Sequence, residues 1–282
     1  MQEYLDTLRN VLENGNDRQT RNAKTRALFG PQMRFDMTEG FPMVTTKFIP
    51  FKSVASELLW FVEGSGDERR LAELLHGTRD SEKKTIWTGN RDADYWTERG
   101  HQKHPSDLGR IYGVQWRSWQ SPDGSQTDQL AEVIERIKND PTDRRLLVTA
   151  WNPGELDQMA LPPCHYSFQF FVSDGSLSLL MNQRSCDMFL GVPFNIASYG
   201  LLLHMVCHLT DLKPKELILN LGDAHIYHDH FDQVREQLSR TPGPLPTLKI
   251  TREVESIDDY TMDDFELVGY EHQGAIKAPM AV

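Results

Sequence analysis

A β-hairpin near the middle of the chain is the feature that most constrains its fold. Residues 165–172 and 177–181 are strand-forming runs joined by Ser173-Asp174-Gly175, and so short a connection permits only antiparallel pairing. Residues 196–209 form a helix that is apolar nearly all round, which predicts a central position. Strands and helices do not alternate regularly. We therefore predict one α+β domain over residues 1–282, with a mixed or antiparallel β-sheet packed with helices.

The remaining elements are predicted from apolar periodicity. Helices are expected at residues 4–13, 51–62, 128–138 and 230–239, and strands at residues 146–151, 217–219 and 225–227. The polar residues 16–26 are either a solvated loop or an anion-binding loop. Residues 109–113 are expected to form a loop whose glycines let the backbone approach a ligand. The apolar tail, residues 276–282, is expected to dock on the protein.

The net charge of -11 argues against nonspecific binding to nucleic acid or to anionic membranes, so any anion site must be local. Arg144 and Arg145 precede an expected strand and are either a phosphate grip or ordinary surface charges. His225, His228 and His230 match no common zinc spacing, so no metal is expected. The chain start has no signal-peptide pattern, and no segment approaches membrane-spanning length.

Three cysteines, an odd number without C-x-x-C spacing, are typical of a reduced compartment, and we expect a cytoplasmic protein. Cys186 and Cys207 are expected to pack in the core. Cys164 follows two prolines and directly precedes a strand, a stiff setting that could display a nucleophile, although most single cysteines are inert. His165 and nearby arginines are candidate cations for lowering its pKa. Glu57, in an apolar helix, is either a solvated residue or an acid-base group.

Three motifs carry a resemblance to a known family. They are Pro163-Cys164-His165, the polar run from Gln183 to Asp187, and the segment from Gly191 to Tyr199. Together they closely resemble the thymidylate synthases, from the first helix to the last two residues. The resemblance implies a homodimer paired through its sheets. It also implies conversion of dUMP to dTMP with 5,10-methylenetetrahydrofolate as one-carbon donor and reductant, without a metal.

The resemblance also implies roles for individual residues. Cys164 would add to uracil C6, Glu57 would move protons through ordered water, and Tyr112 would help remove the C5 proton. Asn195 would read the uracil edge, and Asp187 would belong to both the catalytic and the folate site. The other expected dUMP contacts are Arg184, Ser185, His165, Gln183, His225, Tyr227, Arg18 or Arg21, and Arg144 and Arg145 of the partner subunit. The other expected folate contacts are Lys47, Trp87, Leu190, Gly191, Phe194 and the closing Ala281 and Val282.

The sequence departs from the family pattern at several positions. The arginine loop after Arg21 lacks its usual glycines, Thr88 replaces a usual aspartate, and Asn182 and Asp229 replace a tyrosine and an asparagine. Two other functions therefore stay open. A dUMP hydroxymethylase would let water capture the methylene, but Trp87 and the intact Ala281-Val282 end favour hydride transfer. A non-catalytic nucleotide- or RNA-binding protein is disfavoured by the complete set of expected catalytic residues and the acidic charge.

Overall fold

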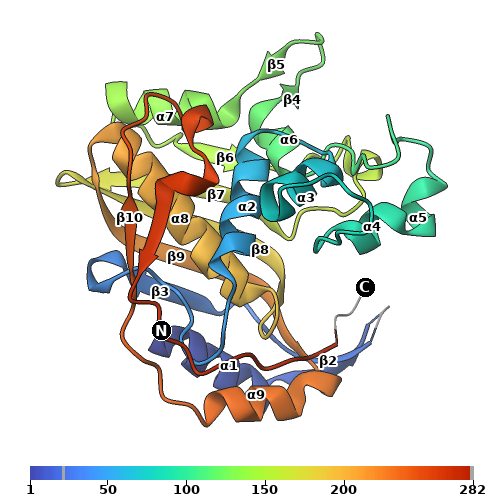
Figure 1. Ribbon diagram of the computed structural model, residues 1–282, viewed down its shortest axis with the longest axis vertical. Helices are drawn as coiled ribbons and strands as arrows, with labels where there is room; N and C mark the ends of the chain where they lie inside the picture. Colours follow the sequence, from blue (N-terminus) through green and yellow to red (C-terminus); the bar gives the residue numbers. More distant parts are fainter. Residues whose placement is uncertain (21–22, 280–282) are drawn as a thin grey trace.

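The protein is built around one twisted sheet with helices on one side (Figure 1). The computed structural model describes residues 1–20 and 23–279. Within these residues a seven-stranded sheet has the order β1-β2-β9-β8-β7-β6, and β3 pairs with another part of β9. Its strands are β1 (Asn16–Gln19), β2 (Lys24–Phe29), β3 (Gln32–Asp36), β6 (Leu147–Thr149), β7 (His165–Ser173), β8 (Ser176–Asp187) and β9 (Lys213–Tyr227).

Two small two-stranded sheets and a set of helices accompany the main sheet. The small sheets pair β4 (Trp119–Gln120) with β5 (Gln126–Thr127), and β10 (Thr247–Ile250) with β11 (Phe265–Val268). The α-helices are α1 (Gln2–Asn14), α2 (Phe51–Val62), α3 (Glu68–His76), α4 (Thr88–Asp92), α5 (Asp94–Thr97), α6 (Tyr112–Arg117), α7 (Gln129–Asn139), α8 (Val192–Thr210) and α9 (Phe231–Leu238).

The expected hairpin is present as β7 and β8, and its turn uses positive φ angles of 51° at Asp174 and 70° at Gly175. Strand β8 then leads through α8 to β9, which runs parallel to β8 because a helix returns the chain to the starting end of the sheet. All other pairs in the sheet are antiparallel. The predicted α+β class with a mixed sheet is therefore confirmed.

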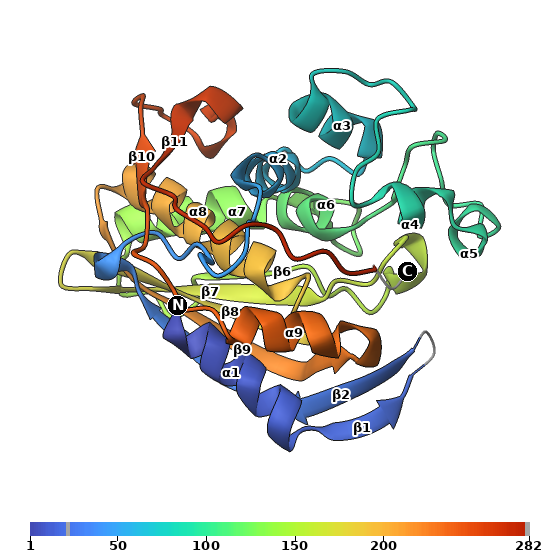
Figure 2. The ribbon, with the colours of Figure 1, turned by 60° about the horizontal axis from the view of Figure 1, so that its bottom comes forward.

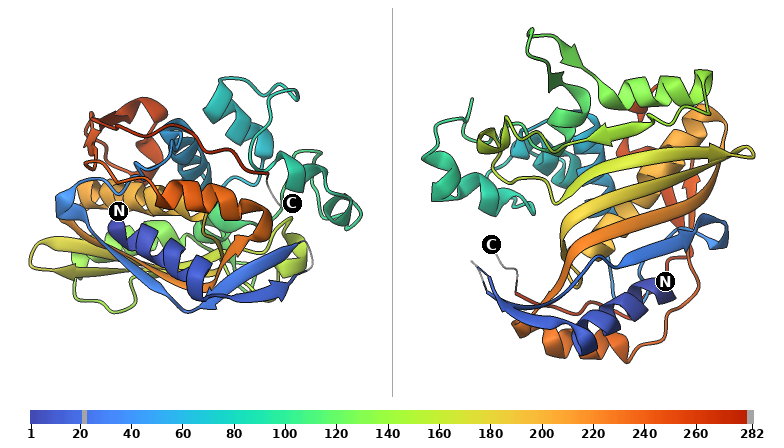
Figure 3. Two further views of the ribbon diagram at one scale, coloured as in Figure 1. Left: turned by 90° about the horizontal axis from the view of Figure 1, so that it is seen from below. Right: turned by 180° about the vertical axis from the view of Figure 1, so that it is seen from behind.

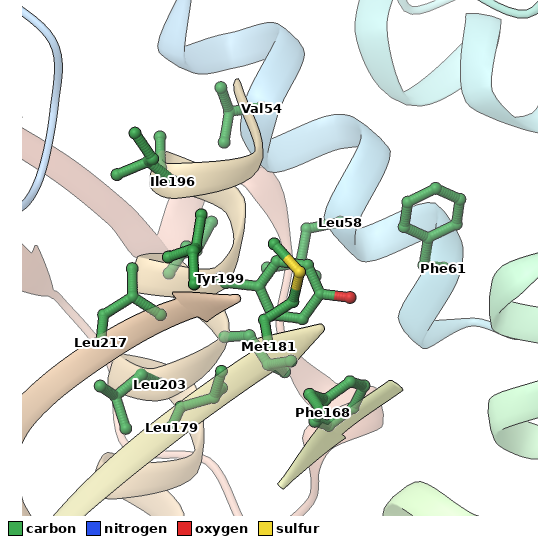
Figure 4. Close-up of a cluster of buried hydrophobic side chains, with 14 of the residues drawn as sticks. Val54, Leu58, Phe61, Phe168, Leu179, Met181, Ile196, Tyr199, Leu203 and Leu217 are labelled. Atoms are coloured by element: carbon green, nitrogen blue, oxygen red, sulfur yellow. The ribbon is translucent and has the colours of Figure 1, made fainter. Parts of the chain in front are cut away.

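Helix α8 lies against the sheet and forms the centre of the core. The expectation that no segment approaches membrane-spanning length was wrong for α8, because its length and composition would allow it to cross a membrane. However, 72% of the relevant window is buried inside the protein, as in a core helix. Figure 4 shows how α2, α8 and the strands meet through apolar side chains that include Leu58, Met181 and Tyr199. Cys186 and Cys207 are buried, which confirms their expected packing role.

The two faces of the sheet differ. Helices α2, α6, α7 and α8 lie on one side, whereas no helix of the described chain covers the strands in the view from behind (Figures 2 and 3). The uncovered face carries Leu147 and Phe171, which are 45% and 67% exposed. It also carries a row of side-chain hydrogen bonds across four strands, from Gln32 to Asn220 to Asn182 to Ser167. Asn182 therefore lies on the face opposite Gln183, whose side chain contacts Asn195 of α8.

Two sequence predictions about strands were wrong. Residues 16–26 are not a loop, because β1 and β2 form an antiparallel ribbon whose first strand is exposed along its whole length. A strand that is exposed to solvent on both faces has no alternation of apolar and polar residues by which a sequence would predict it. Residues 217–219 and 225–227 belong to one continuous strand, β9. Gly222 does not break it but permits close packing, since a Cβ there would lie 2.9 Å from the Arg184 carbonyl oxygen.

The prediction of a ligand-approaching loop at residues 109–113 was also wrong. Part of that segment is helix α6, and its glycines admit protein backbone rather than a ligand. A Cβ on Gly109 would lie 2.1 Å from the Gln158 carbonyl oxygen, and one on Gly113 would lie 2.1 Å from that of Phe61. Such distances exclude any side chain, so these glycines fix α6 against its neighbours.

The tail docks as expected over its described part. Ile276 and Ala278 pack against the core, and the Pro279 carbonyl oxygen lies 2.6 Å from His230 Nε2. Ala281 and Val282, the residues expected to close over the folate, lie outside the described residues, as does Arg21.

Candidate active site

Cys164 lies directly before β7 and remains partly accessible. Its backbone N–H donates to the Tyr112 hydroxyl oxygen at 2.7 Å. The Arg184 guanidinium donates to the carbonyl oxygens of Pro162 and Pro163, each at 2.8 Å, and its Nη2 lies 4.0 Å from the Cys164 Sγ. The turn before the strand is thus held from two sides, and a permanent cation stands beside the thiol.

The electrostatics of Cys164 depend on two opposing influences. Burial raises the pKa of the Cys164 thiol, while the Arg184 charge and the hydrogen bond with Tyr112 oppose that rise. His165 does not contribute a charge, because burial lowers its pKa to about 3 and leaves the ring neutral at pH 7. Its Nδ1 lies 2.8 Å from the Tyr199 hydroxyl. The expectation that His165 is a cation beside the thiol is therefore wrong, and Arg184 alone has that role among these neighbours.

Tyr112 begins helix α6 in a strained conformation, with a positive φ of 22°. Its ring lies 4.3 Å from the His165 ring and 5.0 Å from the Phe61 ring, measured between centroids. Burial raises the pKa of Tyr112 well above its usual value. The packing holds the neutral Tyr112 hydroxyl next to Cys164, although the Tyr112 backbone is strained. Such strain is common where a functional side chain must keep a fixed orientation.

Glu57 and Trp87 come together from helix α2 and the segment before α4. Trp87 Nε1 donates to Glu57 Oε1 at 2.7 Å, and the Trp87 and Tyr112 rings lie 5.7 Å apart. Burial raises the pKa of Glu57 to about 7, and the hydrogen bond from Trp87 limits that rise. Because its side chain remains partly accessible, Glu57 is suited to exchange protons near neutral pH.

The polar run predicted after the hairpin is the end of β8, and it faces the first turn of α8. Gln183 Nε2 donates to Asn195 Oδ1 at 3.1 Å and to the Ser185 carbonyl oxygen at 3.0 Å. The Gln183 Oε1 is buried and has no hydrogen-bond partner among the described residues. Gln183 thereby fixes the orientation of the Asn195 amide, whose nitrogen is left to donate elsewhere.

The segment from Asp187 to Phe194 contains half of the expected folate contacts. Asp187 Oδ1 accepts from the backbone N–H groups of Phe189 and Leu190, both at 3.0 Å, so it shapes the turn into α8. Lys47 Nζ donates to the Phe189 carbonyl oxygen and lies 3.8 Å from that ring's centroid. Burial lowers the pKa of Lys47 to about 8. Four members of the expected set remain partly accessible, namely Asp187, Leu190, Gly191 and Phe194.

The end of β9 brings in His225 and Tyr227, whose rings are 5.3 Å apart. His225 Nδ1 lies 3.1 Å from Asp223 Oδ1, and the other Asp223 oxygen accepts from Arg18 Nη1 at 2.6 Å. Burial opposes protonation of His225, but the hydrogen bonds with Asp223 and the negative charges of Asp187 and Asp223 together raise the pKa of His225. Arg18 thus already has an anionic partner, one that sequence reasoning missed because Asp223 stands next to a glycine in an apparent turn.

Arg144 and Arg145 are set apart from this group. Both are exposed just before β6, and Arg145 pairs with Asp143 at 2.9 Å. Within residues 1–20 and 23–279, no hydrogen bond or ion pair joins either arginine to another expected site residue. A single chain therefore does not assemble the full set of cations that the sequence suggested for phosphate.

Sequence reasoning also missed a buried carboxylate, Glu68, which binds both threonines that flank Trp87. It lies in a polar segment that looked like a surface insertion, so no apolar pattern marked it as buried. Among the residues with described positions, no group of three His, Cys, Asp or Glu side chains could hold a metal ion.

The geometry joins a partly accessible thiol, a fixed guanidinium, a carboxyl group that titrates near neutrality and an oriented amide. These are the parts required for nucleophilic addition followed by proton transfer. The family model described as thymidylate synthase matches residues 2–282, which is nearly the whole chain.

Proposed function

Because the chain belongs to the thymidylate synthase family, we propose that it converts dUMP to dTMP with 5,10-methylenetetrahydrofolate as co-substrate. The family is one of dUMP methyltransferase-type enzymes, and the specific products are our proposal. The observation that carries it is the Cys164 thiol held beside Arg184 and Tyr112, with Glu57 near its titration point. Burial lets such groups interact strongly and keeps the carboxyl group reactive as both acid and base.

The proposed reaction begins when the Cys164 sulfur forms a bond to uracil C6, which makes C5 nucleophilic. C5 then attacks the methylene of the folate, and the bond between that carbon and the folate nitrogen breaks after C5 loses its proton. A hydride from the tetrahydrofolate reduces the exocyclic methylene to methyl as the C6–S bond breaks, and dihydrofolate is left. Asn195 would bind the uracil edge, and Glu57 and Tyr112 would serve the proton transfers.

A dUMP hydroxymethylase is the second candidate, in which water adds to the exocyclic methylene in place of hydride. The buried indole of Trp87 beside Glu57 favours the synthase, because it excludes water from that side of the site. Incubation of the protein with dUMP and 5,10-methylenetetrahydrofolate distinguishes the two by mass spectrometry. We expect dTMP with dihydrofolate. Hydroxymethyl-dUMP with tetrahydrofolate would establish the second candidate, and binding without turnover would point to a non-catalytic protein.

The nucleophile is tested by Cys164→Ala. We expect turnover to be abolished while dUMP binding remains measurable, because Arg184 and Asn195 are untouched. Steady-state assays and calorimetric titration with dUMP measure the two effects. Cys207→Ala is the matched control, since it removes a thiol from the core helix α8 and should keep activity. Full activity in Cys164→Ala would reject the assignment.

The proposal includes a homodimer formed through the uncovered face of the sheet, in the cytoplasm and without DNA or membrane partners. Exposed Leu147 and Phe171 on that face would be buried, and Arg144 and Arg145 would reach the phosphate site of the partner subunit. Light scattering tests the dimer. Inactive Cys164→Ala and Arg144→Ala/Arg145→Ala subunits, when mixed and reassembled, should regain about a quarter of wild-type activity, because random pairing makes half the dimers hybrids with one complete site. No recovery would mean that the arginines are not shared.

A further inference from the structure

Glu68 is a fully buried carboxylate in the first turn of α3, and it accepts five hydrogen bonds. Arg69 donates twice, through Nε and Nη2, both at 2.7 Å, and Arg91 donates through Nη1 at 2.8 Å. The hydroxyls of Thr85 and Thr88 donate at 2.6 and 2.8 Å. Three of the five bonds therefore connect α3 to residues 85–91, a segment distant from it in sequence.

The segment bound in this way contains Trp87. Thr85 Oγ1 accepts from the Trp87 backbone N–H at 3.1 Å, and Thr88 Oγ1 accepts from the Thr85 backbone N–H at 2.8 Å. Both threonine hydroxyls thus accept hydrogen bonds from backbone N–H groups around Trp87 while they donate to Glu68. The backbone of Trp87 is defined by this arrangement, and its ring packs at 5.7 Å from those of Trp60 and Tyr112.

The position of the Trp87 indole has a consequence for Glu57, to which its Nε1 donates at 2.7 Å. Two titratable groups of the aromatic cluster around Trp87, namely Tyr112 and His165, are uncharged near pH 7. Burial raises the pKa of Tyr112 well above its usual value and lowers that of His165 to about 3. The indole N–H is therefore the polar partner that opposes the effect of burial on the Glu57 pKa.

We propose that Glu68 is a positioning residue, which acts through Thr85 and Thr88 to aim the Trp87 N–H at the Glu57 carboxylate. The catalytic meaning of this link rests on the proposed function of Glu57, but the link itself does not. Thr88, a departure from the family pattern, has a neutral hydroxyl, and the negative charge in this place comes from Glu68 on α3.

If the Glu68 hydrogen bonds only held α3 against residues 85–91, their loss would lower the stability of the protein and would leave the titration of Glu57 unchanged. A link that aims the indole must also alter the titration of Glu57, because a weaker hydrogen bond to the carboxylate favours its protonated form. The two possibilities are separated by measuring the titration directly. The Trp87 indole N–H resonance in ¹⁵N-tryptophan-labelled protein should follow the ionisation of Glu57, and Trp87→Phe identifies that resonance by its loss.

The first test uses Thr88→Val, which keeps the shape of the side chain but removes its hydroxyl. The midpoint of the Trp87 titration should rise by about half a pH unit, a fraction of what a full charge-assisted hydrogen bond provides. Thr88→Ser retains the hydroxyl and should restore the wild-type midpoint. Glu73→Gln, an exposed carboxylate of the same helix paired with Arg70 and Arg79, is the matched control and should leave the midpoint unchanged.

The second test combines Glu68→Gln with Trp87→Phe and follows the pH profile of kcat/KM. Each single variant should move the profile to higher pH, by about one unit for Trp87→Phe and less for Glu68→Gln. The double variant should move it no further than Trp87→Phe alone, since both act through one hydrogen bond. Unchanged midpoints in Thr88→Val and Glu68→Gln, together with a lower melting temperature, would overturn the proposal. The resonance titration gives its result even if dTMP is not the product, so failure of the proposed function is distinguishable.

Discussion

Glu57 and Glu68 are two carboxylates on adjacent helices, α2 and α3, that are held in opposite states. Glu57 accepts a hydrogen bond from Trp87, and burial raises its pKa to about 7. Glu68 has no exposed surface, yet five donors hold its pKa below the usual value against the opposing effect of burial. Donors, more than burial, thus decide the charge of a carboxyl group. One of these groups is poised to exchange protons and the other is fixed as an anion.

The largest expected effect is on the stability of Glu68→Gln. Loss of the charge leaves the enclosed guanidinium groups of Arg69 and Arg91 without their anionic partner, which should lower the free energy of unfolding by about 3 kcal/mol. Urea unfolding followed by circular dichroism measures this loss. A decrease below about 1 kcal/mol would mean that Glu68 is not held as a buried anion and that the contrast with Glu57 is wrong.

A smaller effect, with a pH dependence, is expected for Glu57→Gln. The folded-state pKa of Glu57 is raised from 4.5 to about 7, so the folded protein binds the proton more tightly than the unfolded chain. Its stabilising contribution is complete below pH 4.5 and is lost as the pH rises through about 7. Glu57→Gln should therefore gain stability relative to wild type between pH 5 and pH 8, by about 2 kcal/mol. Urea unfolding at both pH values provides the measurement, and a constant difference would refute it.

The smallest effect is expected for Glu73→Gln, which extends the comparison to the surface. Glu73 lies on α3, the helix that carries Glu68, and pairs with Arg70 and Arg79, but its side chain is 40% exposed. Water compensates for the lost partners of an exposed ion pair. The urea midpoint of this variant should match that of wild type, and a clear decrease would show that helix α3 as a whole, rather than the Glu68 cluster, is sensitive to charge.

Part of the fold could be predicted from the sequence because the signals were local. The hairpin turn at Asp174 and Gly175, the apolar helix α8 and the amphipathic helices α1, α2 and α7 were all predicted close to their observed bounds. The ribbon of β1 and β2 was missed because β1 is polar and exposed along its whole length, so it has no apolar alternation. The break expected in β9 at Gly222 was wrong because the glycine serves packing against Arg184.

The candidate site divides in the same way. The sequence by itself determined the residue types, and their motifs indicated Cys164, Arg184 and Asn195 as members of one site. Only the tertiary structure decided that His165 is neutral, that Arg18 is paired with Asp223, and that Glu68 lies buried behind Trp87. The charge state and the orientation of these side chains depend on their burial and on hydrogen-bond donors from distant parts of the chain. A linear sequence does not contain those distances.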